Sequence, residues 1–306
     1  MDTAAGRDTP GRRSPCARRP ECGVAGALLM NVARRQRRLG LCGWLVMISL
    51  AGPLVRADQF DHEYATYAGV LRSHVVLPLV DYKALTANRA GLDRAVAECD
   101  ALAARAEPGW SREQRLAFWI NAYNAFTLRA IIDHYPIQSG VLTLQPRNSI
   151  RQIDGVWTSL KWRAAGRMVT LDEIEHQILR PGFKDARIHF AVNCASISCP
   201  PLAAEPYRAR TLDAQLDAAA RTYLAGPEGL QLAGDTLRVS SIFKWYGGDF
   251  LADYAVLVPG DRDPTERAIL GAILKYGPPT ASRRAGTGTP AVRYLAYNWS
   301  LNDTSR

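Results

Sequence analysis

The sequence lacks several features that identify common protein classes. It has no glycine-rich phosphate loop, no dinucleotide-binding fingerprint and no G-x-S-x-G element, so it offers no motif for a nucleotide-binding protein or an α/β-hydrolase. It has no internal repeat and no heptad run, which leaves a coiled-coil scaffold role unsupported. No apolar run comfortably reaches the roughly 20 residues that a membrane-spanning helix requires.

The sequence also lacks cysteine and histidine pairs at the spacing of metal ligands. Cys194 and Cys199 are spaced as C-x4-C, and no second Cys/His pair appears at the spacing of a zinc site. The spacing differs from the C-x-x-C of thioredoxin-like redox sites as well. The sequence therefore predicts neither a metal nor a cofactor.

Positive charge is abundant but unevenly placed. The chain of 306 residues has a formal net charge of +9. Residues 1–57 contain ten Arg, no Lys and three acidic residues, a net of +7, which leaves 9 − 7 = +2 for residues 58–306. The body of the chain thus gives little electrostatic reason to expect a nucleic-acid partner.

Residues 1–57 are predicted to be a disordered leader followed by a signal peptide. The basic segment Arg34–Arg38 precedes an apolar run from Leu39 to Leu50, and small residues follow at Val55-Arg56-Ala57. We expect cleavage near Ala57, a periplasmic or secreted mature protein, and membrane contact only transiently, through the signal peptide. Met30, directly ahead of the basic segment, is an alternative start.

Residues 58–306 are predicted to form a single globular domain that is rich in helices. Pro/Gly stops and two capping boxes, Ser111 with Gln114 and Thr170 with Glu173, delimit most of the expected helices. The expected helices span Thr86 to Ala106, Ser111 to Tyr135, Thr170 to Arg180, Thr211 to Leu224 and Asp263 to Gly277. Residues 281–290 form the one segment whose composition predicts flexibility.

Strands are predicted to be few and short. Leu230–Leu232 and Leu237–Val239 flank a turn and predict a hairpin, and Met168-Val169 is expected to pair near Val156-Trp157. Alternation from Ile188 to Val192 predicts a further strand. The pattern indicates an α+β fold, with helices around a small, mainly antiparallel sheet.

The segment from Arg187 to Pro201 carries the densest set of chemically active side chains. On the predicted strand, His189 and Asn193 share one face and could act as a base and its orienting group beside a thiol. His189 is as readily a structural histidine. Reduced, Cys194 or Cys199 could be a nucleophile, and after export the two are expected to form a disulfide that leaves Cys99 unpaired.

Glu175 lies on the apolar stripe of the helix that starts at Thr170. A carboxylate there requires a partner, and we expect Arg151, Arg180 or His189 to provide one. Glu175 is either a general base or orienting carboxylate, or one half of an ion pair that ties the helix to the sheet. Candidate binding residues on the same helix are His176 and Arg180.

Further candidate binding residues lie in two aromatic segments and in the cysteine loop. Asn121 and Asn124 interrupt an aromatic helix, three residues apart, and are interpreted as bracing the cysteine loop or lining a pocket. Lys244 and Trp245 belong to an aromatic cluster that forms either a groove wall or core packing. Ser198 lies inside the cysteine loop.

The motifs Phe118–Ala125, Leu171–Arg180 and Arg187–Ala191, followed by Cys194, Ser198, Cys199 and Pro200, resemble the domain-of-unknown-function 547 family (DUF547). The resemblance covers roughly residues 110–225, with Ile242–Tyr246 as a further match, so a family-like core is expected over about 110–250. It implies no activity, since the family is named for lacking one. Bacterial members are often exported, which agrees with the leader.

A weaker similarity is to papain-like and transglutaminase-like folds, where a helix packs on a sheet that carries a histidine. The corresponding helix here carries Asn121 and Asn124 and no cysteine, so a thiol nucleophile would have to come from the loop.

Two hypotheses follow. The first is an exported enzyme for acyl transfer or amide hydrolysis, with Cys194 or Cys199 as nucleophile, His189 as base, and Glu175 or Asn193 as orienting group; thiol–disulfide exchange is a variant. The second is a non-catalytic domain that binds a small-molecule or peptide ligand, or another protein, in which a Cys194–Cys199 disulfide shapes the groove.

Overall fold

A computed structural model describes residues 60–102, 107–138, 146, 148–287 and 289–305. The chain divides into two units, residues 1–54 and 55–306, and the described residues all belong to the second. The predicted leader and cleavage site lie outside the described residues. Within those ranges, the structure contains no helix with the length and apolar character needed to cross a membrane.

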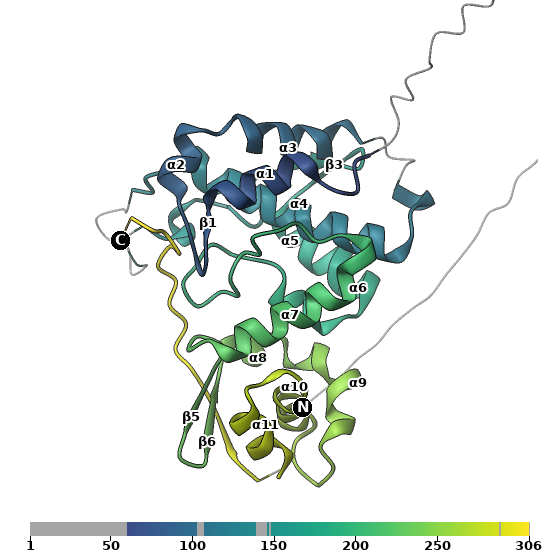
Figure 1. Ribbon diagram of the computed structural model, residues 1–306, viewed down its shortest axis with the longest axis vertical. Coiled ribbons are helices and arrows are strands. Elements are labelled where there is room, and N and C mark those ends of the chain that lie inside the picture. The colour runs from purple at the N-terminus through teal and green to yellow at the C-terminus, as the bar shows by residue number, and fades with distance from the viewer. Residues whose placement is uncertain (1–59, 103–106, 139–145, 147, 288, 306) are drawn as a thin grey trace, which may run out of the picture. The chain divides into compact units, whose positions relative to one another are not determined.

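Helices dominate the described unit, which confirms the helix-rich α+β class (Figure 1). The α-helices are α1 (Ala65–His74), α2 (Tyr82–Ala87), α3 (Ala90–Ala101), α4 (Arg112–Asp133), α5 (Leu171–Glu173), α6 (Arg180–Phe183), α7 (Leu212–Ala225), α8 (Ser241–Tyr246), α9 (Leu251–Tyr254), α10 (Pro264–Tyr276) and α11 (Pro279–Gly286). Short 3-10 turns are η1 (Glu107–Gly109), η2 (Ile150–Gln152), η4 (Ala186–Phe190), η5 (Ala209–Thr211), η6 (Gly247–Phe250) and η7 (Ala255–Leu257), and η3 (Ile174–Leu179) is a π-helical segment.

The strands form three separate small sheets in the described residues, where one sheet was expected. The strands are β1 (Val75–Val76), β2 (Leu79–Val80), β3 (Trp162–Ala164), β4 (Arg167–Val169), β5 (Leu230–Ala233), β6 (Thr236–Val239) and β7 (Ala291–Tyr294). The pairs β1–β2, β3–β4 and β5–β6 are antiparallel, and β7 adds to β6 in parallel. The hairpin predicted at β5–β6 is confirmed, whereas Met168-Val169 pairs with Trp162-Arg163, not with the residues near Val156.

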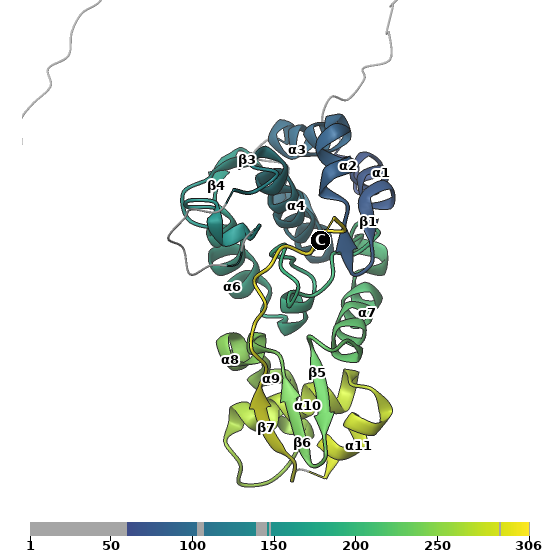
Figure 2. The same ribbon diagram turned by 90° about the vertical axis from the view of Figure 1, so that its left-hand side faces the viewer.

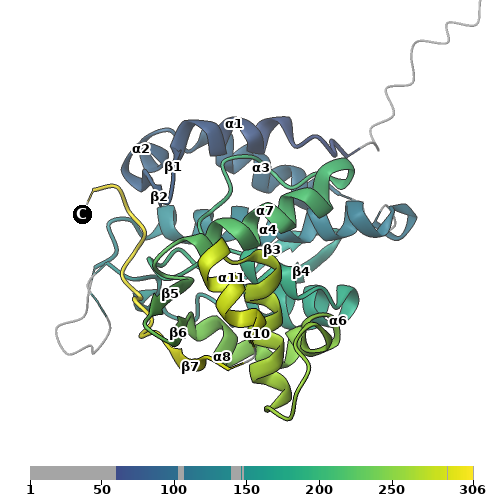
Figure 3. The same cartoon turned by 60° about the horizontal axis from the view of Figure 1, so that its bottom comes forward.

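The buried apolar side chains form two clusters. The first gathers around α4, which is buried on nearly all sides, and includes Trp119 and Phe126. The second gathers around α10 and the β5–β6–β7 sheet and includes Phe243 and Ile269. Figure 3 shows α10 and α11 side by side, in contact with each other. The segment predicted to be flexible is thus helical over its first residues, in α11.

Local capping chemistry sets the start of several helices as predicted. Ser111 with Gln114 and Thr170 with Glu173 both form complete capping boxes, and Asp263 caps α10. The helix that starts after Thr170 does not end at Arg180. Its middle turn is π-helical, the Arg180 N–H donates to the Glu175 carbonyl, and α6 then continues to Phe183.

The prediction of a strand over residues 188–192 is wrong, because these residues form the end of the 3-10 turn η4 and the start of the loop after it. The side chain of Asp185 accepts a hydrogen bond from the Arg187 N–H and starts the turn. Beyond the turn, the Asn124 side chain bonds the Ala191 carbonyl and the Asn193 N–H, which replaces a neighbouring strand. An alternating pattern therefore does not become a strand here.

The C-terminal segment runs from β7 back to the first cluster, where β1 and β2 lie (Figure 2). Isolated bridges join Ser196 to Leu301 and Val80 to Asp303. The same segment contacts the cysteine loop, since the Ile197 N–H donates to the Ser300 carbonyl. This return places the last aromatic residues of the chain beside Cys194.

Candidate functional site

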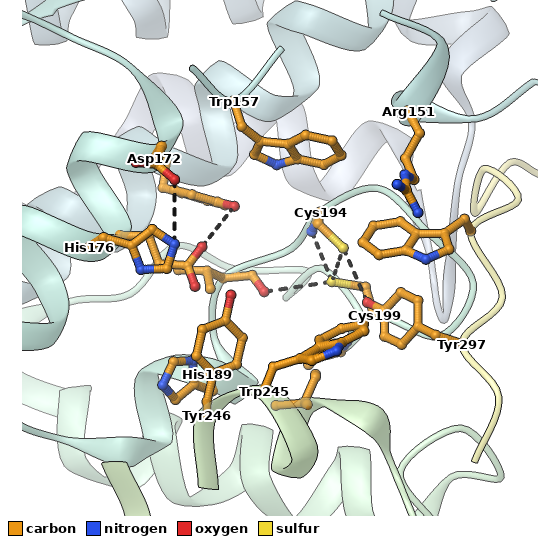
Figure 4. Close-up of a pocket in the computed structure, with 16 residues that line it drawn as sticks. Arg151, Trp157, Asp172, His176, His189, Cys194, Cys199, Trp245, Tyr246 and Tyr297 are labelled. Carbon is orange, nitrogen blue, oxygen red and sulfur yellow. Dashed lines mark hydrogen bonds and ion pairs between the residues drawn. The ribbon is translucent and has the colours of Figure 1, made fainter. Parts of the chain in front are cut away.

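A cavity of about 380 Å³ opens where the two apolar clusters meet (Figure 4). Its aromatic walls come from α4, the turn before β3, α8 and the C-terminal segment; these residues are Tyr123, Trp157, Trp245, Tyr246, Tyr297 and Trp299. Its ionisable residues are Arg151, Asp172, Glu175, His176, His189, Cys194 and Cys199. The structure thus brings the predicted imidazoles, carboxylate and thiols to one pocket, which is of ordinary size for a small-molecule site.

Cys194 and Cys199 are free thiols in the structure, with their Sγ atoms 2.9 Å apart. The disulfide expected from the sequence is therefore not present. The Cys194 N–H donates to Cys199 Sγ at 2.9 Å, so the loop folds back on itself without a covalent bridge. The two thiols act as one hydrogen-bonded unit on the pocket wall.

Cys194 is the more exposed thiol of the pair and is surrounded by hydroxyl groups. Its Sγ lies 3.2 Å from the Ser196 hydroxyl and 3.2 Å from the Tyr297 hydroxyl. Hydrogen bonds from Cys199, then from Ser196 and Tyr297, lower the pKa of Cys194 even though burial opposes this. Such an environment favours the thiolate, which is the nucleophilic form.

Cys199 and Cys99 are the opposite case. Cys199 is buried, and burial together with the neighbouring Cys194 raises its pKa well above the ordinary value. Its Sγ also lies 3.8 Å from the Val192 carbonyl. Cys99 is buried in the first apolar cluster, and desolvation raises its pKa to about 12. Of the three, only Cys194 combines access with a lowered pKa.

His189 is bonded to a carboxylate that the sequence analysis did not single out. Its Nε2 lies 2.7 Å from Asp249 Oδ2, and the same carboxylate accepts from Arg180 at 2.6 and 3.0 Å. The hydrogen bonds from His189 and Arg180 lower the pKa of Asp249 below its ordinary value. Among the described residues, no hydrogen bond joins His189 to either sulfur, so it is not placed to take a proton directly from Cys194.

Tyr246 separates His189 from the open part of the pocket. Its ring stacks on the imidazole, with centroids 4.1 Å apart and planes at 18°, and the Arg180 guanidinium lies 5.0 Å from its centroid. Figure 4 shows Tyr246 in front of His189, on the side of the thiols. The imidazole therefore orients the pocket wall through Tyr246 and Asp249.

Glu175 is buried and is held by hydroxyl groups. Tyr123 donates to its Oε2 at 3.4 Å, and burial together with the Glu175 charge raises the pKa of Tyr246. The expected partners Arg151, Arg180 and His189 form no ion pair with it in the described part of the chain, and Arg180 pairs with Asp249 instead. The ion-pair interpretation of Glu175 is thus not what the structure shows.

His176 is held between a donor and an acceptor. The Arg180 Nη1 donates to His176 Nδ1 at 2.9 Å, which leaves the ring proton on Nε2, 3.5 Å from Asp172 Oδ1. No group of three or more His, Cys, Asp or Glu residues suited to a metal ion occurs in the described ranges.

The predicted asparagines brace the main chain and do not line the pocket. Asn121 makes two hydrogen bonds with the main chain of Tyr207, and Asn124 makes two with the segment that follows η4. Asn193 bonds the Pro200 carbonyl at 2.7 Å and the Ala195 N–H at 2.9 Å, so it shapes the cysteine loop. All three amides are used structurally.

Of the other candidate binding residues, one lines the pocket and the rest lie around it. Trp245 lines the pocket and is 46% exposed. Lys244 is exposed and lies outside the lining. Ser198 hydrogen-bonds Glu228 and the Asn298 N–H and ties the loop to the C-terminal segment. Arg180 lies behind the wall, where it holds His176 and Asp249.

Sequence reasoning missed several residues of this site. Tyr246 belongs to the segment Ile242–Tyr246 already noted and Asp249 follows it closely, but nothing local marks Asp249 as the partner of His189. Tyr297 and Trp299 form an aromatic pair with ring centroids 4.6 Å apart near the end of the chain. Two aromatic residues two positions apart, near the end of the chain, were the one signal that could have indicated them.

Fold and site together define a helix-rich α+β domain with a cysteine-bearing aromatic pocket. Residues 108–224, less than half of the chain, match the family described as "Protein of unknown function, DUF547". The match includes the cysteine loop and Glu175, His176 and His189, but not α8 or the C-terminal segment. No curated protein and no solved structure shows significant similarity to the chain.

Proposed function

We propose that this protein is a thiol-dependent enzyme in which Cys194 attacks a carbonyl group of a small-molecule or peptide substrate held in the aromatic pocket. The observation that carries the proposal is the environment of Cys194. It is the accessible member of the thiol pair, its pKa is lowered, and Tyr297 and Ser196 lie 3.2 Å from its sulfur.

The reaction proceeds in two steps that balance without a further reagent besides water. The Cys194 thiolate forms a bond to the carbonyl carbon, and the leaving amine or alcohol departs with the electrons of its bond and takes up a proton. Water then cleaves the thioester, which returns the thiol and releases a carboxylic acid, unless an amine or alcohol accepts the acyl group.

Neighbouring groups have roles that follow from their positions. The Tyr297 and Ser196 hydroxyls can donate to the oxyanion that develops beside the sulfur. Glu175 and His176 line the same pocket and are the groups that could exchange a proton with the leaving group. His189 orients the wall through Asp249 and Tyr246, a positioning role in place of the base role predicted from the sequence.

The proposal is tested by acylation with p-nitrophenyl acetate and aminoacyl p-nitroanilides. Intact-protein mass spectrometry should show one acyl group, mapped to Cys194, and a burst of chromogenic product equal to the enzyme concentration. Cys194→Ala should abolish the adduct, whereas Cys99→Ala, which removes the buried thiol outside the pocket, should leave it unchanged. An adduct of equal yield in Cys194→Ala would overturn the proposal.

A second candidate is a non-catalytic binding protein whose cysteines form a disulfide. The observation that favours it is the 2.9 Å separation of the two sulfur atoms, which requires little movement for a bridge to form under oxidation. We also propose that residues 1–57 direct export, which would supply that oxidising environment. Alkylation of protein isolated from the periplasm, before and after reduction, separates the candidates: blocked thiols favour the binder, and a rapidly alkylated Cys194 favours the enzyme.

A further inference from the structure

The charged residues of the pocket are separated to opposite sides of the thiol pair. Figure 4 shows Arg151 on one side of Cys194, and Asp172 and His176 on the other. Among the described residues, the Arg151 guanidinium forms no ion pair; it lies 4.9 Å from the centroid of the Trp299 ring. An exposed cation at the edge of a concave aromatic wall is available for an anionic group of a ligand.

The opposite side carries excess negative charge. The charge of Arg180 is matched by Asp249 through two hydrogen bonds, and Arg180 Nη1 also lies 2.9 Å from His176 Nδ1. Among the described cationic or imidazole groups, Asp172 faces only the His176 ring, at 3.5 Å. Glu175 accepts a hydrogen bond from the Tyr123 hydroxyl. Neither carboxylate pairs with a Lys or Arg in the described part of the chain, which suits a cationic ligand group.

The remaining wall is apolar. Trp157, Trp245 and Trp299 surround the space between the charged ends, and the Trp157–Trp299 and Trp245–Trp299 ring centroids are each 6.0 Å apart. A cavity of about 380 Å³ is near the lower end of the range of about 300–1,000 Å³ for small-molecule sites. Its volume suits a ligand of a few residues with apolar side chains.

We propose that the pocket binds a dipolar peptide-like substrate such as a dipeptide, whose amine faces Asp172 and Glu175 and whose anionic group faces Arg151. This inference rests on the proposed function, because the amide carbonyl between the two charges would then lie against Cys194. It identifies the substrate class by charge: a free amine at one end, an anion at the other, and a carbonyl between them.

The test uses an equimolar mixture of apolar dipeptides and two capped forms of the same mixture, one acetylated at the amine and one amidated at the carboxylate. Binding is measured by native mass spectrometry and by quenching of tryptophan fluorescence in the full chain that carries Cys194→Ala. Each cap should weaken binding by about fivefold, the effect of one partly exposed charge pair. Because the thiol is absent, the measurement does not depend on the acylation chemistry.

Substitution of a charged pocket residue should remove the preference for the free form of the ligand group that this residue binds. Arg151→Gln should bind the free and amidated mixtures equally and still reject the acetylated one. Asp172→Asn, alone and with Glu175→Gln, should lose the preference for the free amine. The controls Arg163→Gln, on β3, and Asp154→Asn, an exposed residue outside the lining, should keep both preferences.

The two proposals fail separately. Equal binding of free and capped mixtures, or no binding of any, would overturn the dipolar substrate while leaving Cys194 acylation to its own test. Selective binding without any Cys194 adduct in the native protein would support the dipolar ligand class and contradict the enzyme.

Discussion

His189 and Asp249 come from segments 60 residues apart, and the imidazole Nε2 lies 2.7 Å from the carboxylate Oδ2. With Arg180 on the same carboxylate, they form a cluster behind the pocket wall, on which the Tyr246 ring stacks. This contact joins η4 to η6 through side chains. An imidazole engaged by a carboxylate behind a tyrosine ring agrees with the positioning role proposed for His189.

The Asp249 contact predicts a stability change that depends on pH. The pKa of Asp249 is lowered in the folded protein by His189 and Arg180, so its stabilising effect is complete above the unfolded value of about 3.9 and is lost as the pH falls towards the folded value. Asp249→Asn should lower the free energy of unfolding at pH 7 by about 1 kcal/mol, a figure reduced for partial exposure.

Urea denaturation at pH 7, 5 and 3 measures this effect. The difference between Asp249→Asn and the native protein should be full at pH 7 and smaller at pH 3, while the exposed Asp154→Asn control should match the native protein throughout. A difference that grows on acidification would contradict the assignment of the lowered pKa.

The three cysteines in the described part of the chain should react in a fixed order. Cys194 is accessible with a lowered pKa, Cys199 is buried with a raised pKa, and Cys99 is buried with a pKa of about 12. Iodoacetamide should label Cys194 first, with a pH profile whose midpoint lies below the ordinary cysteine pKa of about 8.5. Peptide mapping after timed quenching checks the order; initial labelling of Cys99 would show that the pocket geometry is wrong.

Removal of the Tyr297 hydroxyl should make Cys194 less acidic. The hydroxyl lies 3.2 Å from Cys194 Sγ and 3.2 Å from Ser196 Oγ. Tyr297→Phe should shift the pH profile of Cys194 alkylation upwards and slow the reaction several-fold at pH 7, with little change at high pH where the thiolate predominates. The matched control is Tyr254→Phe, whose hydroxyl bonds Tyr276 outside the pocket and should leave the profile unchanged.

Asn124 should be more important for stability than a neighbouring polar residue on the same helix. Its amide makes two buried hydrogen bonds, to the Ala191 carbonyl and the Asn193 N–H. Asn124→Ala leaves both main-chain groups without that partner and should cost about 1–3 kcal/mol. Thr127→Val is the control, because the buried Thr127 hydroxyl has no hydrogen-bond partner among the described residues, and the isosteric change should be nearly neutral.

Thermal or urea unfolding of the two variants compares them directly. If Thr127→Val destabilises the protein as much as Asn124→Ala, tight packing of α4, rather than support of the cysteine loop, would explain both results.

Much of the secondary structure and part of the site were predictable from local patterns. Capping boxes located the starts of the helices after Ser111 and Thr170, and a turn flanked by β-branched and leucine residues predicted the β5–β6 hairpin. These signals involve groups a few residues apart, so neighbouring atoms decide them. The segment from Arg187 to Pro201 and the helix with Glu175 and His176 were identified for the same reason: their side chains are chemically distinctive by themselves.

The sequence by itself determined the helix-rich class and the segments that supply the thiols, an imidazole and the buried carboxylate, because propensity, capping and residue chemistry are local. Only the tertiary structure decided that residues 186–190 form a 3-10 turn, that His189 pairs with Asp249, and that Tyr297 reaches Cys194. Each of these depends on a hydrogen-bond partner supplied by a distant segment. The stabilising free energy of such a hydrogen bond arises only when the folded chain brings the two segments together and removes them from water.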